Sequence, residues 1–435
     1  MTAMNPGLAV KQAILLLGDI LVLYGALALA LLIRYGTVAW TPVAASHIEP
    51  FSVLFVFWIA LFYINNLYDM RGQKNTGAWR RGLVGALTAS AVVSIVFFYL
   101  VTDYGIAPKT NLFVFLIAAS GLMYGWRSLY NAVVRKRVPF TETLVMGDTA
   151  TAAEIMKAIA DNPQLGYRLT KDPAKAELVI VPPAARADAG LAAMLCRAAA
   201  EGIAVTDTAS FYEAIMKKLP LADLEPAWFL GQVANRKTVY DFVREPVEIA
   251  MAGALAVLTL PLTLPIALAV RLTSSGPVIF QQKRVGEFGK EFVLLKFRSM
   301  VANAPDGSAE AGTGAVWKTA NDPRFTRIGR FLERTHLDEL PQLINIMRGE
   351  ASFVGPRPER PTFVGELAKT IPYYDLRHLV KPGIAGWAQL NYKYGASAED
   401  AYEKLQYDLW YLKNRSFWLD LSIIMKTARL FIARN

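Results

Sequence analysis

Two adjacent carboxylates, Asp338 and Glu339, are the residues best suited to chemistry in this chain. On a helix their side chains would point about 100° apart, because the helix has 3.6 residues per turn. One could attack an electrophile or accept a proton while the other holds Mg²⁺ through oxygen. Arg334 precedes Asp338 by one helical turn, so we expect the two to share a helix face and the carboxylate to stay ionised. The alternative is a surface Arg–Asp pair worth about 0.3–0.5 kcal/mol.

Basic side chains in the same third of the chain could bind phosphate, which favours fixed cations and the bidentate grip of arginine. Arg357 stands between Pro356 and Pro358, and these prolines restrict the backbone around it. Its side chain could therefore be held ready for a ligand, although a rigid turn with a solvated arginine would have the same sequence. The other candidates are Lys296, Arg298 and Arg334.

The composition of the whole chain favours a membrane protein. Apolar residues make up 54% and charged residues 19%, against about 45–50% and about 25% in soluble domains. The net charge of +10 suits an anionic membrane face or nucleic acid. Because the chain has no arginine-rich helix or RNA-binding signature, we expect no nucleic acid partner. The single cysteine, Cys196, excludes intrachain disulfides and a cysteine-based zinc site.

The first third of the chain is built to cross a bilayer. Four apolar segments, 8–33, 51–67, 83–101 and 112–130, are each near the ~20 residues that a membrane-spanning helix needs. Basic residues gather after the second and fourth segments, so the positive-inside rule places both ends of the bundle in the cytoplasm. We predict a four-helix transmembrane bundle over residues 1–138, with the soluble parts and the site on the cytoplasmic face. A buried helical core of a soluble protein is the alternative.

Residues 139–235 alternate short apolar strands with helices, which predicts a small Rossmann-like parallel α/β domain. We expect strands at 142–146, 178–181 and 203–205, and helices at 150–160 and 187–200. The first turn, Gly147-Asp148-Thr149, has one glycine where a dinucleotide fingerprint needs three. We therefore expect no bound dinucleotide and a structural or regulatory role for this domain.

A fifth apolar run, at 247–270, contains Pro261 and Pro265. Basic residues flank both of its ends, so both flanks prefer the cytoplasm. Because proline breaks or kinks a helix, we predict a re-entrant membrane helix that turns back at these prolines. The helix would belong to a C-terminal catalytic α/β domain over residues 236–435. A straight fifth crossing is the alternative, and it would put the rest of the chain outside the cell.

The motifs of the last third resemble a known family. From about residue 244 to 430 the chain is similar to the bacterial polyprenyl-phosphate sugar-1-phosphate transferases that have a single re-entrant membrane helix. The matching clusters are 276–286, 295–300, 322–342, 354–359, 381–389 and 407–411. Larger members of that family also carry four N-terminal helices and a Rossmann-like domain. The sequence departs from the family at Leu260, where a serine often precedes the proline, and at Glu248, where aspartate is common.

The resemblance implies an activity. A UDP-sugar would donate its sugar-1-phosphate to polyprenyl (undecaprenyl) phosphate and release UMP, as the first membrane step of exopolysaccharide, O-antigen or capsule synthesis. Asp338 would form a phosphoaspartyl intermediate, and Glu339 would bind Mg²⁺. Asp408 matches an acidic family position and is predicted as a further metal ligand. The expected substrate-binding residues are Gln282, Arg284, Lys296, Arg298, Arg334 and Arg357. The family also allows a homodimer, and the transferred sugar is not readable from the sequence.

Three other functions compete with this interpretation. A membrane-anchored nucleotide-sugar dehydratase would need a Tyr-x-x-x-Lys pair on a helix, and Tyr167 and Lys171 have that spacing in a segment that reads as a loop. A catalytically dead scaffold would have no reason to keep the Asp338–Glu339 pair. A conventional metal-dependent glycosyltransferase would need an Asp-x-Asp triplet, which the sequence lacks.

Overall fold

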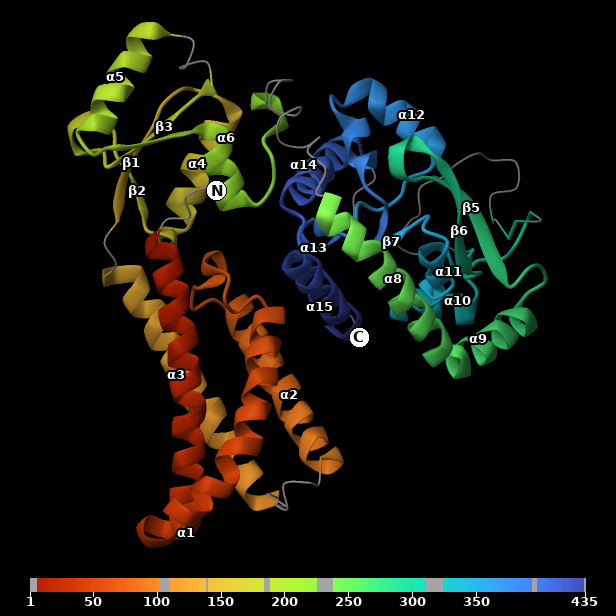
Figure 1. Ribbon diagram of the computed structural model, residues 1–435, viewed down its shortest axis with the longest axis horizontal. Helices are drawn as coiled ribbons and strands as arrows, with labels where there is room; N and C mark the ends of the chain where they lie inside the picture. Colours follow the sequence, from red (N-terminus) through yellow and green to blue (C-terminus); the bar gives the residue numbers. More distant parts are fainter. Residues whose placement is uncertain are drawn as a thin grey trace. The chain divides into compact units, whose positions relative to one another are not determined.

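The fold is described by a computed structural model of the chain, shown in Figure 1, over residues 6–101, 109–137, 140–183, 188–224, 238–304, 306–307, 309, 324–392 and 397–433. Contacts divide the chain into two compact units, Met1–Ala214 and Ile215–Asn435. The predicted domain boundaries fall at residues 138–139 and 235–236, outside the described residues, so the division into three domains stays a prediction.

The first unit begins with apolar helices that lie side by side: α1 (Pro6–Ile64), α2 (Gly77–Leu100) and α3 (Lys109–Arg137). Helix α1 bends at Gly36, whose φ of 70° is readily adopted only by glycine, and this bend makes two spans of one helix. Four segments are long and apolar enough to cross a membrane: Leu8–Thr37, Val43–Ile64, Gly77–Leu100 and Thr110–Val133. The prediction of four apolar helical segments long enough to cross a membrane is confirmed.

Aromatic side chains and one ion pair hold the bundle together. The ring of Phe115 lies 5.1 Å from that of Phe51 and 5.5 Å from that of Trp58, and all three side chains are fully buried. Asp19 on α1 and Arg127 on α3 form an ion pair of 2.5 Å, and both side chains are fully buried. Because an unpaired charge in an apolar interior is costly, the pair favours the arrangement in which Asp19 on α1 faces Arg127 on α3.

The rest of the first unit is a parallel sheet of four strands in the order β2-β1-β3-β4. The strands are β1 (Thr141–Val145), β2 (Tyr167–Leu169), β3 (Leu178–Val181) and β4 (Ala204–Asp207). Helix α5 (Ala189–Ala200) lies on one side of the sheet, and helices α4 (Ala150–Asp161) and α6 (Thr208–Met216) lie on the other (Figure 1). The predicted parallel α/β fold is confirmed.

Strand β2 was not expected from the sequence. It has three residues and no fully buried position, so it has neither the length nor the apolar alternation that predicts a strand. It follows Gly166, whose φ of 85° ends a short 3-10 helix at Pro163–Leu165. Tyr167 therefore begins a strand, and the helix that a dehydratase Tyr-x-x-x-Lys pair requires is absent from this described segment.

The second unit opens with two apolar helices, α8 (Thr238–Leu258) and α9 (Leu260–Thr273), which meet at a bend of 66°. Pro261 stands in the first turn of α9, where its missing N–H costs no helical hydrogen bond. Pro265 lies inside α9. The break that the prolines predicted is present, and it falls at Thr259.

Short strands and helices build the rest of the second unit. Strands β5 (Ile279–Val285) and β6 (Glu291–Phe297) form an antiparallel hairpin, and β7 (Ser352–Val354) pairs in parallel with β8 (Gly383–Ala385). The helices are α10 (Arg327–Thr335), α11 (Gln342–Met347), α12 (Pro361–Thr370), α13 (Trp387–Asn391), α14 (Ala398–Asn414) and α15 (Phe417–Ala433). The chain therefore combines membrane helices with α/β regions, as the sequence predicted.

The bent helix pair packs on the segments that surround the two candidate carboxylates. Ala252 on α8 is fully buried against Leu343 and Ile346 of α11. Ile266 and Val270 on α9 pack with an apolar cluster from β6 and α10. Because α10 ends just before Asp338 and α11 begins just after Glu339, both halves of the bent pair support the same turn.

Candidate functional site

The two candidate carboxylates lie on a tight turn between helices. Helix α10 ends at Thr335, His336 adopts a left-handed conformation with φ 54°, and a 3-10 helix η7 (Leu337–Glu339) carries Asp338 and Glu339. The expectation that Arg334 and Asp338 share a helix face was wrong. The left-handed residue reverses the chain between them and ends the 3.6-residue period on which that expectation depended.

Apolar neighbours fix this turn. Leu337 and Leu340 flank the carboxylates and pack into the cluster that contains Phe297 and Leu332. As a result Asp338 is only 6% exposed and Glu339 only 8% exposed. Carboxylates so far from water need compensating charge or hydrogen bonds, which the neighbouring elements supply unequally.

Two cations meet on Glu339. Lys296 on β6 donates from Nζ to Glu339 Oε1 at 2.6 Å, and Arg357 donates from Nη2 to the same oxygen at 3.2 Å. Asp338 is engaged less closely, because Lys296 Nζ lies 3.7 Å from its Oδ2. Its other oxygen, Oδ1, is buried and has no hydrogen-bond partner among the described residues. One carboxylate is thus held by cations while its neighbour keeps a free oxygen.

The unequal surroundings shift the two pKa values in opposite directions. Burial raises the pKa of Asp338 above its usual value, and the nearby Lys296 only partly opposes the rise. Burial also acts to raise the pKa of Glu339, but Lys296 and Arg357 outweigh it, and the pKa falls to about 2. Adjacent groups whose environments separate their pKa values commonly have different roles in one reaction.

Arg357 is held by the turn that follows β7. The Gly355 N–H donates to Ala385 O at 2.9 Å, and a Cβ on Gly355 would lie 2.4 Å from Lys381 O, so only glycine fits. On the other side, Arg377 donates to the Arg357 carbonyl at 3.0 Å. The Pro-Arg-Pro turn is therefore anchored from both sides.

Asp408 lies in a different ion pair. Its carboxylate, on α14, accepts from Arg377 at 2.9 Å, and both side chains are buried. Burial raises the pKa of Asp408 to about 6 despite this partner. Arg377 also donates to Tyr374 at 2.7 Å. The structure joins Asp408 to the Arg357 turn through Arg377, not to the Asp338–Glu339 pair.

Two of the other predicted binding residues are held by the protein itself. Arg298 is buried and donates to backbone carbonyls at the end of α9, among them Ser274 O at 2.7 Å and Val270 O at 3.2 Å. Arg284 donates to Gln282 at 2.5 Å and to the Pro358 carbonyl at 2.9 Å, so Arg284 and Gln282 lie near the Arg357 turn.

Arg334 differs from both, since it is exposed on α10 and makes no hydrogen bond or ion pair with the described residues. Of the six predicted binding residues, Lys296 and Arg357 contact the carboxylate pair directly. Asp322 and Pro323, at the start of the 322–342 motif, lie outside the described residues.

A small pocket opens beside the Arg357 turn. Its walls are Val285, Gly286, Pro356, Arg357, Pro358, Arg377, His378, Val380 and Pro382. Burial and the neighbouring Arg377 lower the pKa of His378 to about 4, so this histidine is neutral near pH 7. The positive charge beside the pocket therefore comes from its two arginines, which also pair with Glu339 and Asp408. Arg377 was missed in the sequence, because no spacing rule connects it with an aspartate on another helix.

The acidic groups limit how a metal could be held. Among the described residues, no three His, Cys, Asp or Glu side chains gather in a group that could hold a metal ion. The two adjacent carboxylates on the short helix η7 still fit Mg²⁺, which is usually bound by one or two carboxylates together with substrate phosphates.

Comparisons with known proteins find similarity in the C-terminal part of the chain, which contains the candidate site. The model of the bacterial sugar transferase family matches residues 239–434. UDP-N-acetylgalactosamine-undecaprenyl-phosphate N-acetylgalactosaminephosphotransferase of Aeromonas hydrophila is 41% identical over 194 residues, which are 45% of this chain and 44% of that protein. UDP-glucose:undecaprenyl-phosphate glucose-1-phosphate transferase of Xanthomonas campestris pv. campestris is 46% identical over 170 residues, 39% of this chain and 34% of that protein.

A third relative is covered more fully. A UDP-glucose:undecaprenyl-phosphate glucose-1-phosphate transferase of Caulobacter vibrioides is 35% identical over 210 residues, which are 48% of this chain and 74% of that protein. The chain thus spans less than half the length of the first two relatives and about three quarters of the third.

Proposed function

The chain belongs to the bacterial sugar transferase family, and from this membership we propose that it transfers a sugar-1-phosphate from a UDP-sugar to undecaprenyl phosphate and releases UMP. The names of the relatives support the donor and acceptor classes. The observation that carries the proposal is the pair of buried, adjacent carboxylates, of which Glu339 accepts from two cations while Asp338 keeps an oxygen with no partner among the described residues. We propose glycan assembly at the cytoplasmic face of a bacterial inner membrane as its setting.

In the proposed reaction Asp338 is the nucleophile. Its unpartnered oxygen attacks the sugar-bearing phosphorus of the UDP-sugar, and the bond from that phosphorus to the bridging oxygen breaks as UMP leaves with the electron pair. An oxygen of undecaprenyl phosphate then attacks the phosphoaspartyl group and restores the Asp338 carboxylate. A raised pKa suits this role, because a carboxylate that is less stabilised by neighbouring charge is a stronger nucleophile.

Glu339 and the cations would bind and orient the donor. With its low pKa, Glu339 stays ionised and keeps Lys296 and Arg357 beside Asp338. Both cations are then placed to offset negative charge on the transferred phosphoryl group. Asp338 and Glu339 would hold Mg²⁺ together with phosphate oxygens, and the ion would neutralise charge on the diphosphate.

A trapping experiment tests this proposal. The purified chain is mixed with UDP-glucose, UDP-galactose or UDP-N-acetylgalactosamine and Mg²⁺, without lipid. We expect UMP release up to one equivalent and a sugar-phosphate adduct on the peptide that contains Asp338. Asp338→Asn keeps the shape of the side chain, so it should fold normally, form no adduct and lose several orders of magnitude in turnover.

Glu350→Gln is the matched control, because Glu350 contacts Asn345 and lies outside the carboxylate turn. It should keep both the adduct and the turnover. If the wild-type chain releases UMP only when lipid is present and forms no adduct, transfer is direct and Asp338 acts as a base or metal ligand. If no UDP-sugar is consumed under any condition, the proposed function is wrong.

We also propose that α8 and α9 enter and leave the membrane on the same side. Large apolar side chains face outward along both helices, with Leu258 74%, Leu264 66% and Leu272 77% exposed. The 66° bend at Thr259 fits a broken span or a re-entrant pair, and the basic residues at both flanks favour the re-entrant pair. Such side chains would be unfavourable in water but are stabilised in lipid.

Cysteine labelling distinguishes a re-entrant pair from a crossing. Cys196 is first replaced by serine, and single cysteines are placed at the exposed positions Val239 and Ser275, one at each end of the helix pair. A re-entrant pair predicts that an impermeant reagent labels both positions from the cytoplasmic side only. Labelling of Ser275→Cys from the periplasmic side would instead support a fifth crossing.

A further inference from the structure

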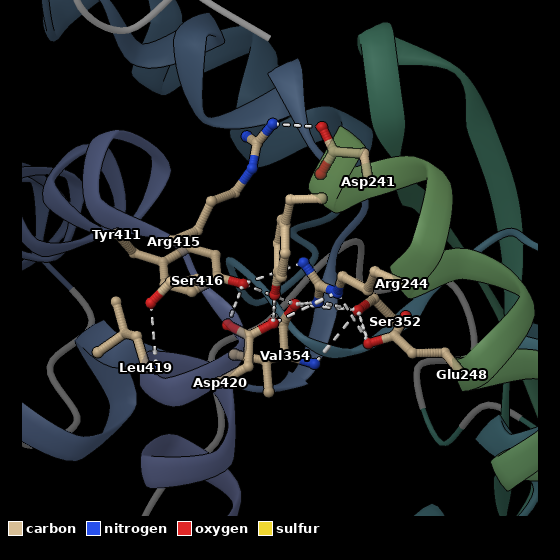
Figure 2. Close-up of polar contacts among 11 residues, drawn as sticks. Asp241, Arg244, Glu248, Ser352, Val354, Tyr411, Arg415, Ser416, Leu419 and Asp420 are labelled. Carbon is tan, nitrogen blue, oxygen red and sulfur yellow. Dashed lines mark hydrogen bonds and ion pairs between the residues drawn. The ribbon is translucent and has the colours of Figure 1, made fainter. Parts of the chain in front are cut away.

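Arg244 lies at the centre of a buried polar cluster that the proposed reaction does not use. It stands on α8, and its guanidinium contacts groups from α8 itself, β7, α14 and α15 (Figure 2). These partners are Glu248, Ser352, Val354, Tyr411 and Asp420. One side chain on the bent helix pair therefore connects it with three other elements of the second unit.

The contact with β7 is to the backbone. Arg244 Nη2 donates to the carbonyl oxygen of Val354, the last residue of the strand, and to the Ser352 hydroxyl. The Tyr411 hydroxyl lies 3.3 Å from the same carbonyl and 2.8 Å from Asp420 Oδ1. Because a guanidinium presents its donors in a rigid plane, these contacts fix the direction of the Val354 carbonyl as well as its position.

Little flexibility separates that carbonyl from the site. Gly355 follows Val354 and is tied to Ala385 O, and Pro356 has a restricted φ. Arg357 comes next and donates to Glu339. The strand itself has three residues and pairs with another of three, so its own ladder gives it little rigidity. A shift of Val354 must therefore be passed on to Arg357.

We propose that Arg244 is a positioning residue that sets the place of Arg357 beside Glu339, and this rests on the function proposed above. Helix α8 packs through Ala252 on α11, directly after the carboxylate turn, and holds β7 through Arg244. Helix α8 therefore sets the distance between the carboxylate turn and the turn that carries Arg357. The site is assembled only when α8 is packed in this position.

Hydrogen exchange in the full-length chain tests the proposal without relying on activity. Arg244→Lys keeps the charge but loses the planar fork, so the peptide covering residues 353–359 should exchange about tenfold faster or more. Arg415→Lys is the matched control. Arg415 is also buried and pairs with α8, but it points toward Asp241 and away from Val354, with a contact of 2.6 Å (Figure 2). It should leave exchange of this peptide unchanged.

A double-mutant cycle adds a catalytic readout. If Arg244 acts through Arg357, Arg244→Lys should lower kcat by a similar factor to Arg357→Lys, and the double variant should be no worse than Arg357→Lys alone. Arg415→Lys should combine additively with Arg357→Lys. A merely structural role for Arg244 predicts additive losses for both pairs.

The outcomes separate the two proposals. Unchanged exchange in Arg244→Lys, or additive losses with Arg357→Lys, overturns the positioning role. An inactive wild-type chain defeats the proposed function, while the exchange result still decides whether Arg244 holds the turn. If Arg244→Lys does not fold, Tyr411→Phe removes a hydroxyl beside the same carbonyl and keeps the ring, and the same local increase in exchange is expected.

Discussion

Arg357 donates from Nη2 to Glu339 Oε1 across 3.2 Å and so joins the turn after β7 to the short helix that carries both carboxylates. Lys296 donates to the same oxygen at 2.6 Å from a third element, β6. Two cations therefore share one carboxylate oxygen, while Asp338 Oδ1 has no partner among the described residues. This asymmetry gives the two carboxylates distinct environments and underlies the roles proposed for them.

The acidic side of the pH–rate profile should depend on Lys296. The nucleophile must be ionised, so activity falls as the pH drops through the pKa of Asp338, which burial has raised. Lys296 favours the ionised form, and Lys296→Met removes that charge. The pKa should then rise further, and the acidic limb of kcat/KM should move to higher pH. Rates are measured at several pH values with saturating Mg²⁺.

Lys283→Met is the control for this profile. Lys283 lies on the same hairpin, is exposed, and pairs with Glu291 at 3.4 Å, away from the carboxylate turn. It should leave the acidic limb in place. A limb that stays fixed or moves to lower pH in Lys296→Met would contradict the electrostatic role of Lys296.

Lysine substitutions of two predicted substrate-binding arginines, Arg298 and Arg334, should have different effects on stability and on activity. Arg298→Lys loses several donors to buried carbonyls at the end of α9, so we expect a loss of about 1–3 kcal/mol in stability. Arg334→Lys changes an exposed side chain with no partner among the described residues, so its melting temperature should hold while KM for the UDP-sugar rises. Thermal melting and steady-state kinetics are compared on both variants. A destabilised Arg334→Lys chain would contradict this assignment.

The close approach at Gly355 should be essential to the site. A Cβ there would lie 2.4 Å from the Lys381 carbonyl oxygen, so Gly355→Ala must push β7 away from the segment before β8 and displace Arg357. We expect lower stability and a large loss of turnover. Gly365→Ala is the control, because nothing lies within 4 Å of its Cβ position in α12, and alanine should stabilise the helix by about 0.5–1 kcal/mol. Equal effects of the two substitutions would contradict the packing argument.

Residues 217–219, near the start of the second unit, should stabilise truncated chains that contain them. Trp387 donates to the Lys217 carbonyl at 3.0 Å, Lys218 pairs with Glu403 at 3.0 Å, and Leu219 is fully buried. A chain that begins at Lys237 loses these contacts, and losing the buried leucine alone should cost about 1.5–3 kcal/mol. We expect it to melt several degrees below a chain that begins at Ile215, with residual transfer activity in both. Identical melting temperatures would show that the segment contributes nothing.

Much of the architecture follows from local patterns in the sequence. Apolar runs of bilayer length predict the four spans, and the alternation of strands with helices predicts the parallel sheet, because both depend on neighbouring residues in the chain. Pro261 predicts the break between α8 and α9 for the same reason, since proline acts on its own backbone. Strand β2 escaped prediction because three residues are too few to show a period.

The order of residues is enough to show that Asp338 and Glu339 are adjacent, that prolines flank Arg357, and that basic groups occur in the same third of the chain. Which cation contacts which carboxylate depends on how distant segments pack in the folded chain. Arg334 was expected beside Asp338, but the left-handed His336 turns the chain away, and Lys296 and Arg357 come to Glu339 instead. Arg377 pairs with Asp408, and Arg298 donates to backbone carbonyls at the end of α9. Side-chain type specifies that a charge needs a partner, whereas packing of distant segments determines which partner is within reach.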